Sequence, residues 1–235
     1  MQHPRYGLVG RGRAATHMAR YLRLEGLLLS RWHRGLETPL EEALAPAEVI
    51  LLLISDDSLE QFVEARPALR GRLLVHFSGS LVVDGLAGLH PLMTFGPDPY
   101  SLETYRSMAF IEEKGGTRFR EVFPTLPNPS WPVEPNLKPL YHALCVLSGN
   151  FTTLLWAKAF EEFRNRLGLP REVLMPYLEQ TCRNVAARGR EALTGALARG
   201  DRDTAARDLA ALEGDPFAEV YRAFAQLVDN REGTS

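Results

Sequence analysis

Cysteine is scarce in this chain, and neither sign of charge dominates. The 235 residues contain two cysteines, Cys145 and Cys182, which lie far apart in segments with a helical pattern. Their spacing excludes a CxxC redox motif and a disulfide framework, and it predicts two buried free thiols. The formal net charge of -2 offers no basic surface, so neither nucleic acid nor an anionic membrane is expected as a partner.

Long apolar runs and metal-binding patterns are also missing. No uninterrupted apolar stretch approaches the roughly 18 residues needed to cross a bilayer, and residues 1–5 lack the apolar core of a signal peptide. We therefore expect a cytoplasmic protein. The six histidines show no HxH, HExxH or Cys/His spacing, so no bound metal is expected. With 45% hydrophobic residues, the chain can nevertheless bury a substantial core.

The sequence pattern changes near residue 136. Up to that point, short apolar runs alternate with helical patterns and turn residues, as in βαβ units around a parallel sheet. After it, the patterns are helical and no convincing strand follows. The prolines of residues 124–135 prevent a helix between the two parts. We predict an α/β domain with a mainly parallel sheet over residues 1–136, followed by an all-helical domain over residues 137–235.

The first predicted strand, residues 6–9, leads into a turn rich in glycine. Residues 10–15 read Gly-Arg-Gly-Arg-Ala-Ala, which fits the G-x-G-x-x-A dinucleotide fingerprint. Gly10 permits the tight turn, and Gly12 lets a pyrophosphate approach the backbone. A helix that begins near Arg13 and Ala14 then offers free N–H groups to the phosphates. Such a turn can also serve packing alone, but the strand before it and the amphipathic helix after it favour a Rossmann nucleotide site.

The end of the second predicted strand, residues 27–32, indicates which nucleotide is preferred. An NAD-selective protein places an acidic residue there to bind the ribose 2′-hydroxyl. This chain has His33 and Arg34 instead. A guanidinium can pair with a 2′-phosphate, whereas a carboxylate would repel it, so NADP is favoured over NAD. The alternative is a solvated arginine in an arginine-rich protein.

Two further predicted strands, residues 48–54 and 72–77, end in polar residues. Ligands of open parallel sheets lie beyond the carboxyl ends of strands, so Ser55, Asp56 and Ser78 are candidates to border the ribose or the nicotinamide. Asp56 or its neighbour would also serve as the N-cap of the next helix, and we expect this capping role for the aspartates. The two roles are compatible.

These motifs, with others along the chain, resemble a known superfamily. The glycine turn followed by Met18-Ala19, and Trp32-His33-Arg34 in place of Trp-Asn-Arg, resemble the β-hydroxyacid dehydrogenase, ketopantoate reductase and pyrroline-5-carboxylate reductase superfamily. One branch is similar over nearly the whole chain, and it comprises Rossmann-like NADP-binding oxidoreductases with a helical C-terminal domain of unknown function. Ala196 departs from the proline that this branch usually has. The closer resemblance is carried by His-Phe-Ser-Gly-Ser at 76–80, His-Pro-Leu-Met-Thr-Phe at 90–95, Tyr-His-Ala at 141–143, Gly-Asn-Phe at 149–151, Ala-Leu-Thr-Gly at 192–195 and Arg-Gly-Asp at 199–201.

The resemblance implies an NADP domain, a helical domain and a dimer formed through the helices, but no particular substrate. Dehydrogenases of the superfamily often carry a lysine four residues before an asparagine, as proton donor to the carbonyl being reduced. Asn150 would put that lysine at position 146, which is Val146. His142 on the same helix, and His90, held extended by Pro91, are the remaining candidates for a general acid.

The pattern over residues 140–160 predicts a central buried helix. Its polar residues His142, Asn150 and Thr153 fall on one stripe of an α-helix, where burial is costly unless they find partners. A cofactor and a substrate in a cleft between the domains would be such partners. A satisfied core histidine and an asparagine bonded to a loop are the alternative. The apolar face comprises Leu140, Leu144, Leu147, Phe151, Leu154 and Leu155.

Three functions are compatible with these features. The first is an NADPH-dependent reductase of a small ketone or imine, with Thr153 and Thr194 as further substrate contacts. The second is a non-catalytic NADP(H)-binding sensor or regulatory protein, which the missing lysine favours. The third is a scaffold that only dimerises, and the intact glycine motif argues against it.

The helical half also predicts an assembly. Leu154, Trp156, Phe160 and Phe163 are spread too widely around the helix axis for one small domain to cover. A homodimer through the helical domain is therefore expected.

Overall fold

The structure is a computed structural model that describes residues 4–232 of the chain. It divides into two compact units, Met1–Leu155 and Trp156–Ser235, which are treated separately below. The sheet itself ends at Val133, close to the expected boundary between residues 136 and 137. That boundary stays a prediction of where the two domains divide.

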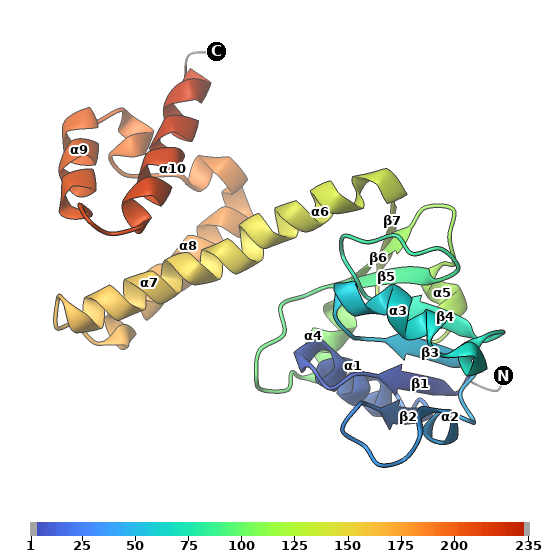
Figure 1. Cartoon of the computed structure of the whole chain (residues 1–235). Coiled ribbons are helices and arrows are strands. Elements are labelled where there is room, and N and C mark those ends of the chain that lie inside the picture. Colours follow the sequence, from blue (N-terminus) through green and yellow to red (C-terminus); the bar gives the residue numbers. More distant parts are fainter. Residues whose placement is uncertain (1–3, 233–235) are drawn as a thin grey trace. The chain divides into compact units, whose positions relative to one another are not determined.

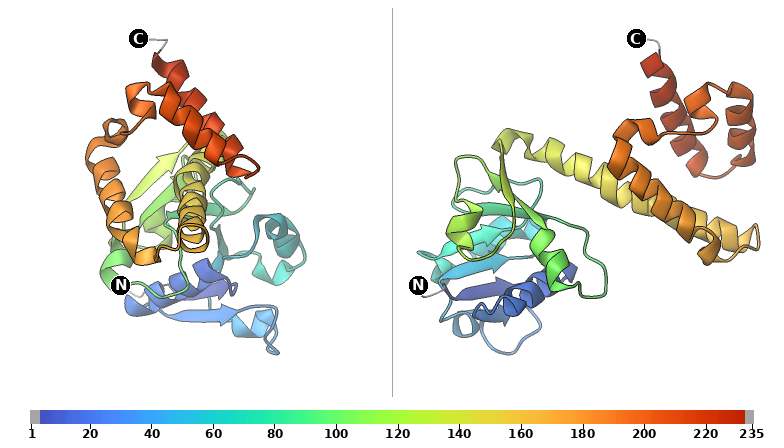
Figure 2. Two further views of the ribbon diagram at one scale, coloured as in Figure 1. Left: turned by 90° about the vertical axis from the view of Figure 1, so that its left-hand side faces the viewer. Right: turned by 180° about the vertical axis from the view of Figure 1, so that it is seen from behind.

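The first unit is built on one seven-stranded sheet with helices on both faces (Figures 1 and 2). The strand order is β2-β1-β3-β4-β5-β6-β7, and the first five strands pair in parallel. Strand β6 is antiparallel to β5 and parallel to β7. This confirms the predicted α/β fold with a mainly parallel sheet. The strands are β1 (Tyr6–Val9), β2 (Leu29–Trp32), β3 (Val49–Leu52), β4 (Leu73–His76), β5 (Ala87–Leu92), β6 (Ala109–Glu113) and β7 (Ser130–Val133).

Each face of the sheet has its own apolar core. Alternation along the strands separates them: Leu8 and Leu51 face one core, whereas Val9 and Ile50 face the other. The first core is covered by α1 (Arg13–Leu24), α4 (Leu102–Ser107) and α5 (Phe119–Val122). The second is covered by α2 (Leu40–Ala43) and α3 (Leu59–Glu64). Because both faces are buried, β3 is apolar throughout, and β4 is apolar up to His76 at its carboxyl end.

The sequence pattern predicted β1 to β4 but missed the last three strands. Strand β5 contains Pro91 and β7 contains Pro132, and both prolines weaken a strand pattern. Strand β7 tolerates Pro132 because it lies at the edge of the sheet and needs hydrogen bonds on one side only.

One long helical segment follows the sheet. It consists of α6 (Lys138–Cys145), a π-helical turn (Val146–Asn150) and α7 (Phe151–Asn165). The prediction that this helix is buried is wrong for the chain alone, because no residue of α7 is buried. An apolar pattern shows that a face needs a cover, and it does not show what supplies the cover. The π-helical turn also shifts the residues beyond it, so the polar stripe expected from an α-helical period is interrupted.

The same helical segment is long and apolar enough to be compared with a membrane-spanning helix. By length and composition alone, Pro135–Asn165 could cross a membrane, although core helices of globular proteins pass the same test. The cytoplasmic location therefore stays a prediction.

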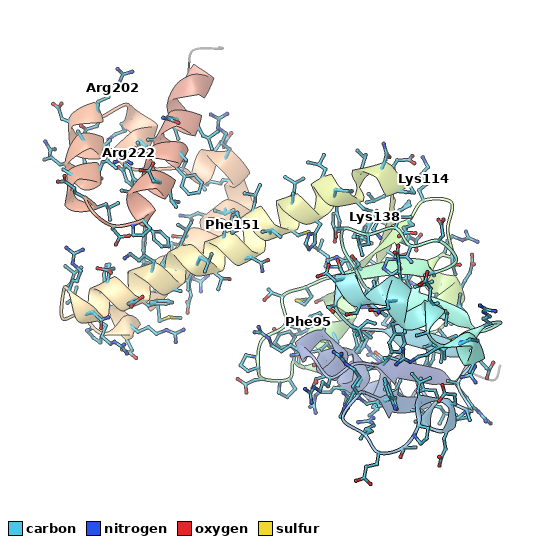
Figure 3. The ribbon with its side chains drawn as sticks, in the orientation of Figure 1. Phe95, Lys114, Lys138, Phe151, Arg202 and Arg222 are labelled. Carbon is cyan, nitrogen blue, oxygen red and sulfur yellow. The ribbon has the colours of Figure 1, made fainter. Side chains whose placement is uncertain are left out.

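The described part of the second unit is helical, as predicted, and comprises the end of α7 with α8 (Met175–Arg188), α9 (Arg202–Ala211) and α10 (Phe217–Glu232). Lys158 on α7 forms ion pairs with Glu162 and with Asp215, which precedes α10. Arg202 and Arg222 mark α9 and α10 in Figure 3.

The two cysteines are free, as predicted. Cys145 is half-buried and Cys182 is exposed, so the expectation that both are buried is wrong. The helical pattern around them was correct, but the faces that carry them are uncovered in the single chain.

Candidate functional site

The glycine turn between β1 and α1 is shaped by close backbone contacts. Gly10 has a φ of 136°, and its N–H donates to the carbonyl oxygen of Trp32 over 2.9 Å. A Cβ at position 10 would lie 2.3 Å from the carbonyl oxygen of Leu53. Only glycine fits here, and the turn therefore brings the ends of β1, β2 and β3 together.

Gly12 has a different environment. It is the N-cap of α1, no side chain caps the helix, and the first turn contains no acidic residue. A Cβ at position 12 would meet no atom within 4 Å. The N-terminus of α1 is thus uncapped by a side chain and open beside Gly12, as a phosphate cradle requires. This turn fits the pyrophosphate of a dinucleotide.

A cavity of 740 Å³ extends from this turn along the ends of β2 and β3. Four arginines and no acidic residue line it, so its charge favours a polyanionic ligand. Seven of the predicted cofactor residues lie on its wall: Gly10, Gly12, Arg13, Ala14, His33, Arg34 and Ser55.

Two further basic side chains line the cavity, and neither was among the predicted cofactor residues. Arg11 lies beside the turn after β2. A Cβ built on Gly35 would be 3.6 Å from the guanidinium of Arg11 and 3.2 Å from the ring of His33. Arg66, just beyond α3, lies over the ring of Phe62 with its guanidinium carbon 3.8 Å from the ring centroid. Arg66 is far from the glycine turn in sequence, so no local signal identified it.

The predicted residues Asp56 and Ser78 are brought together next to this cavity. Ser78 donates its hydroxyl to Asp56 Oδ2 over 2.7 Å, and Ser80 donates to the same oxygen over 3.2 Å. The expectation that an aspartate caps the helix is wrong, because the N-cap positions are Ser55 and Ser58 and neither makes a side-chain cap bond. The carboxylate instead accepts hydrogen bonds from hydroxyl groups of the loop after β4. The local sequence around Asp56 does not predict these contacts.

Two histidines meet above the loop that follows β4. The rings of His90 on β5 and His142 on α6 are edge to face, with centroids 6.2 Å apart. A Cβ at Gly79 would lie 2.6 Å from His142 Cδ2 and 3.1 Å from His90 Nε2. Both predicted acid candidates therefore border the carboxyl end of β4, where ligands of open parallel sheets bind.

The pKa of His90 is lowered to about 4. Burial is the largest cause, the positive forms of His142 and Lys138 add to it, and Asp56 opposes it. His90 is thus a neutral imidazole at neutral pH. The side chain of His142 makes no hydrogen bond to any residue that the structure describes, so structural bonds leave it free for a ligand.

Beneath these histidines lies a buried ion pair that the sequence did not reveal. Lys138, which is labelled in Figure 3, lies in the first turn of α6 and donates to Glu113 Oε1 at the end of β6 over 2.5 Å. His76 is fully buried, with Nε2 3.5 Å from the same oxygen. Burial alone would raise the pKa of Glu113, but its interactions with His76 and Lys138 outweigh burial and lower it. A Cβ at Gly88 would lie 2.1 Å from Glu113 Oε1.

Three other predicted site residues lie elsewhere. Asn150 is exposed and stands eight residues beyond His142, roughly 12 Å along a helix at 1.5 Å per residue. Thr153 is exposed and donates its hydroxyl to the carbonyl oxygen of Gly149 over 2.9 Å. Thr194 is exposed in the second unit. Within the first unit, no described hydrogen bond joins Asn150 or Thr153 to the histidine pair, and the roles of all three residues stay predictions.

Comparison with protein families gives one decisive match. Residues 111–228, half of the chain, match the family described as a domain of unknown function, DUF2520. The chain belongs to the DUF2520 family. A comparison with curated proteins found no match.

Solved structures share the fold of this DUF2520 protein. A candidate NADP oxidoreductase from Bacteroides fragilis is 20% identical with a TM-score of 0.78, over 96% of this chain and 97% of the other. An imine reductase from Myxococcus stipitatus in complex with NADP+ is 15% identical with a TM-score of 0.64, over 99% and 95%. A pyrroline carboxylate reductase from Plasmodium falciparum with NADP bound is 13% identical with a TM-score of 0.59, over 97% and 98%. The expected resemblance to this superfamily is confirmed at the level of the fold.

The two glycines of the turn allow a paired test in this DUF2520 protein. Gly12→Ala has room for its Cβ and an ordinary φ of -65°, so the melting temperature should fall only slightly, through the preference of an N-cap for glycine over alanine. NADPH binding should weaken at least tenfold, because the methyl group would project into the space open to the phosphates. Gly10→Ala should instead lower the melting temperature, because its Cβ would strike the backbone of Leu53.

Thermal unfolding and a titration of NADPH fluorescence measure the two effects. If Gly12→Ala binds NADPH as tightly as the wild type, the turn serves packing and the nucleotide site is elsewhere.

Proposed function

We propose that this DUF2520 protein is an NADP-dependent oxidoreductase that reduces a small ketone or imine. One observation carries the proposal: an open cradle at the N-terminus of α1 leads into an arginine-lined cavity without acidic residues. A pair of histidines borders the same edge of the sheet. The solved structures of similar fold include imine reductases and a reductive aminase, which agrees with this reaction class.

The residues of the cavity suit the parts of an NADP molecule. The N–H groups that follow Gly12 would hold the pyrophosphate. Arg34 and Arg11 lie at or beside the turn after β2, where a ribose 2′-phosphate binds in Rossmann proteins. Ser55 and the hydrogen-bonded pair of Asp56 and Ser78 would border the ribose and nicotinamide.

Reduction of a ketone or imine needs a hydride and a proton. NADPH supplies the hydride when bound. His142 is our candidate for the proton donor, because its imidazole makes no described hydrogen bond and lies beside Gly79. Val146 occupies the position of the lysine that related dehydrogenases use, so the proton must come from another group.

A second candidate function is a non-catalytic NADP(H)-binding sensor or regulatory protein. The observation that favours it is the environment of His90, whose lowered pKa keeps it from becoming a positively charged imidazolium acid at neutral pH. Since Val146 replaces the lysine, the reductase hypothesis depends on His142 alone as the proton donor. Measured turnover separates the two functions, whereas NADPH binding alone fits both.

Replacement of Arg34 tests the nucleotide preference. Arg34→Ala should weaken NADPH binding by about 1.5–3 kcal/mol, the range for a charge-assisted hydrogen bond, and should leave NADH binding nearly unchanged. Fluorescence titration with both nucleotides measures the difference. Arg23→Ala, an exposed arginine of α1 outside the cavity, is the matched control. Equal losses for both nucleotides, or a wild-type preference for NADH, would contradict the proposal.

Replacement of His142 tests catalysis. With a panel of small ketones and cyclic imines, the wild type should oxidise NADPH steadily. His142→Gln should lower kcat by about a hundredfold or more, the usual contribution of a positioned acid. The melting temperature and NADPH affinity should change little, since His142 makes no described hydrogen bond. Asn150→Ala in the same assay tests whether Asn150 orients the carbonyl or imine of the substrate, and it should also lower kcat by about a hundredfold or more.

A loss of stability in His142→Gln would indicate a structural role for this histidine. Loss of a buried structural partner costs about 1–3 kcal/mol of stability. If His142→Gln melts markedly earlier and no member of the panel is turned over, the sensor function is favoured.

We also propose that the protein is a homodimer through its helical segment. No residue of α7 is buried, and Phe151 is one of six large apolar residues exposed between positions 140 and 155 (Figure 3). An exposed apolar face of this kind needs a cover, and a second copy of the same helix offers a matching one. The exposed set comprises Leu140, Leu144, Leu147, Phe151, Leu154 and Leu155.

Light scattering after size exclusion tests this assembly. At micromolar concentration, the wild type should have twice the chain mass of 26.3 kDa. Leu154→Glu should shift it toward the monomer, because a charge would enter the apolar contact. Leu24→Glu, at an exposed leucine of α1, should not. A wild-type monomer would contradict the proposal, and so would a monomer that sediments with phosphatidylcholine vesicles, which would assign the face to a membrane.

A further inference from the structure

Tyr141 on α6 contacts His90, one of the two histidines at the candidate site. Its hydroxyl oxygen lies 2.6 Å from His90 Nδ1, and the two rings are edge to face with centroids 5.5 Å apart. Neighbouring leucines of α6 are exposed, whereas Tyr141 is half-buried. The helix therefore turns this tyrosine toward the sheet, onto a histidine that borders the candidate site.

Which group donates depends on the tautomer of His90. A tyrosine hydroxyl that keeps its proton can donate it, and an imidazole nitrogen without a proton accepts it. With the Tyr141 hydroxyl as donor over 2.6 Å, His90 Nδ1 is the acceptor. Burial raises the pKa of Tyr141, with a further contribution from Cys145, so the phenol keeps its proton. The neutral imidazole of His90 then carries its single proton on Nε2.

The proton on Nε2 lies at the edge of the candidate site. A Cβ at Gly79 would be 3.1 Å from His90 Nε2, so this nitrogen faces the loop at the carboxyl end of β4. Within residues 4–228, for which side chains are described, no group makes a hydrogen bond to it. His76 Nε2 is completely buried without a hydrogen-bond partner, whereas His90 Nε2 is not completely buried. Nε2 therefore carries a proton that no described group accepts, and it is not completely buried.

We propose that Tyr141 is a positioning residue that holds His90 as a neutral hydrogen-bond donor toward the reacting group of the substrate. The inference rests on the proposed reductase function, and it divides the work of the two histidines. His90 would polarise the substrate without giving up its proton, and His142 would supply the proton. A neutral donor requires a lone pair on the group that it contacts, as on a ketone oxygen or an uncharged imine nitrogen.

The groups around His90 agree with this assignment. His142 and Lys138 on α6 disfavour a positive charge on the imidazole, and Asp56 after β3 favours one. Lys138 is held by Glu113 and Asp56 accepts two serine hydroxyls, so neither replaces Tyr141 as the partner of Nδ1. Tyr141 is the described residue that bonds this nitrogen.

The tautomer of His90 can be measured without any ligand. In ¹⁵N-histidine-labelled full-length protein, two-bond proton–nitrogen correlations distinguish a protonated Nε2 from a protonated Nδ1, and His90→Gln assigns the signals. The wild type should show Nε2–H near neutral pH. Tyr141→Phe should give a mixture of both tautomers, and with a reducible ketone or imine it should lower kcat at least tenfold without changing NADPH affinity.

Tyr6→Phe is the matched control, because it also removes a buried tyrosine hydroxyl bond, to the carbonyl oxygen of Val122. It should lower the melting temperature and leave the signals of His90 unchanged. A wild-type His90 protonated on Nδ1, or the same tautomer in Tyr141→Phe, would overturn the inference. The wild-type spectrum decides the tautomer even if Tyr141→Phe does not fold. Since it needs neither NADPH nor substrate, its failure is distinct from a failure of the reductase proposal.

Discussion

The buried ion pair between Lys138 and Glu113 fixes the geometry of the candidate site. It joins the first turn of α6 to the end of β6, and α6 carries both Tyr141 and His142. Without this bond, nothing else described would anchor the start of the helix by a buried charge. Removal of one partner would leave an unpaired charge inside the protein, a cost of about 3–5 kcal/mol. The contacts of His90 with both α6 residues therefore depend on a pair that touches no ligand.

Much of the fold could be predicted because its signals are local. Strand β1 was predicted with its observed bounds, and β3 and β4 were recognised from apolar runs that end in polar residues. Strands β5 and β7 were missed because Pro91 and Pro132 interrupt the pattern. Pro132 is tolerated because β7 lies at the edge of the sheet. The long helix was predicted, but its burial was not, because periodicity identifies an apolar face and not the surface that covers it.

The site was predictable only where neighbours in sequence are neighbours in space. The glycine turn and the residues after β2 line the same cavity, so their shared place on its wall could be predicted from spacing. Arg66 reaches the same cavity from beyond α3, and Tyr141 reaches His90 across 51 positions of sequence. Asp56 was assigned to a helix cap because local geometry allows it, whereas the loop after β4 supplied stronger donors. Contacts between residues that are far apart in sequence depend on the fold, and no sequence motif predicts them.

The close approach at Gly88 has a consequence for how this sequence can drift over evolution. A side chain there would meet both Glu113 and Lys138, which come from a different strand and from a helix. A change at any of the three positions thus alters what the other two can be. Loss of the lysine would favour loss of the carboxylate, and only then would position 88 be free to gain a side chain. These positions should vary together among relatives, and their joint presence in a sequence would signal that α6 is anchored in the same way.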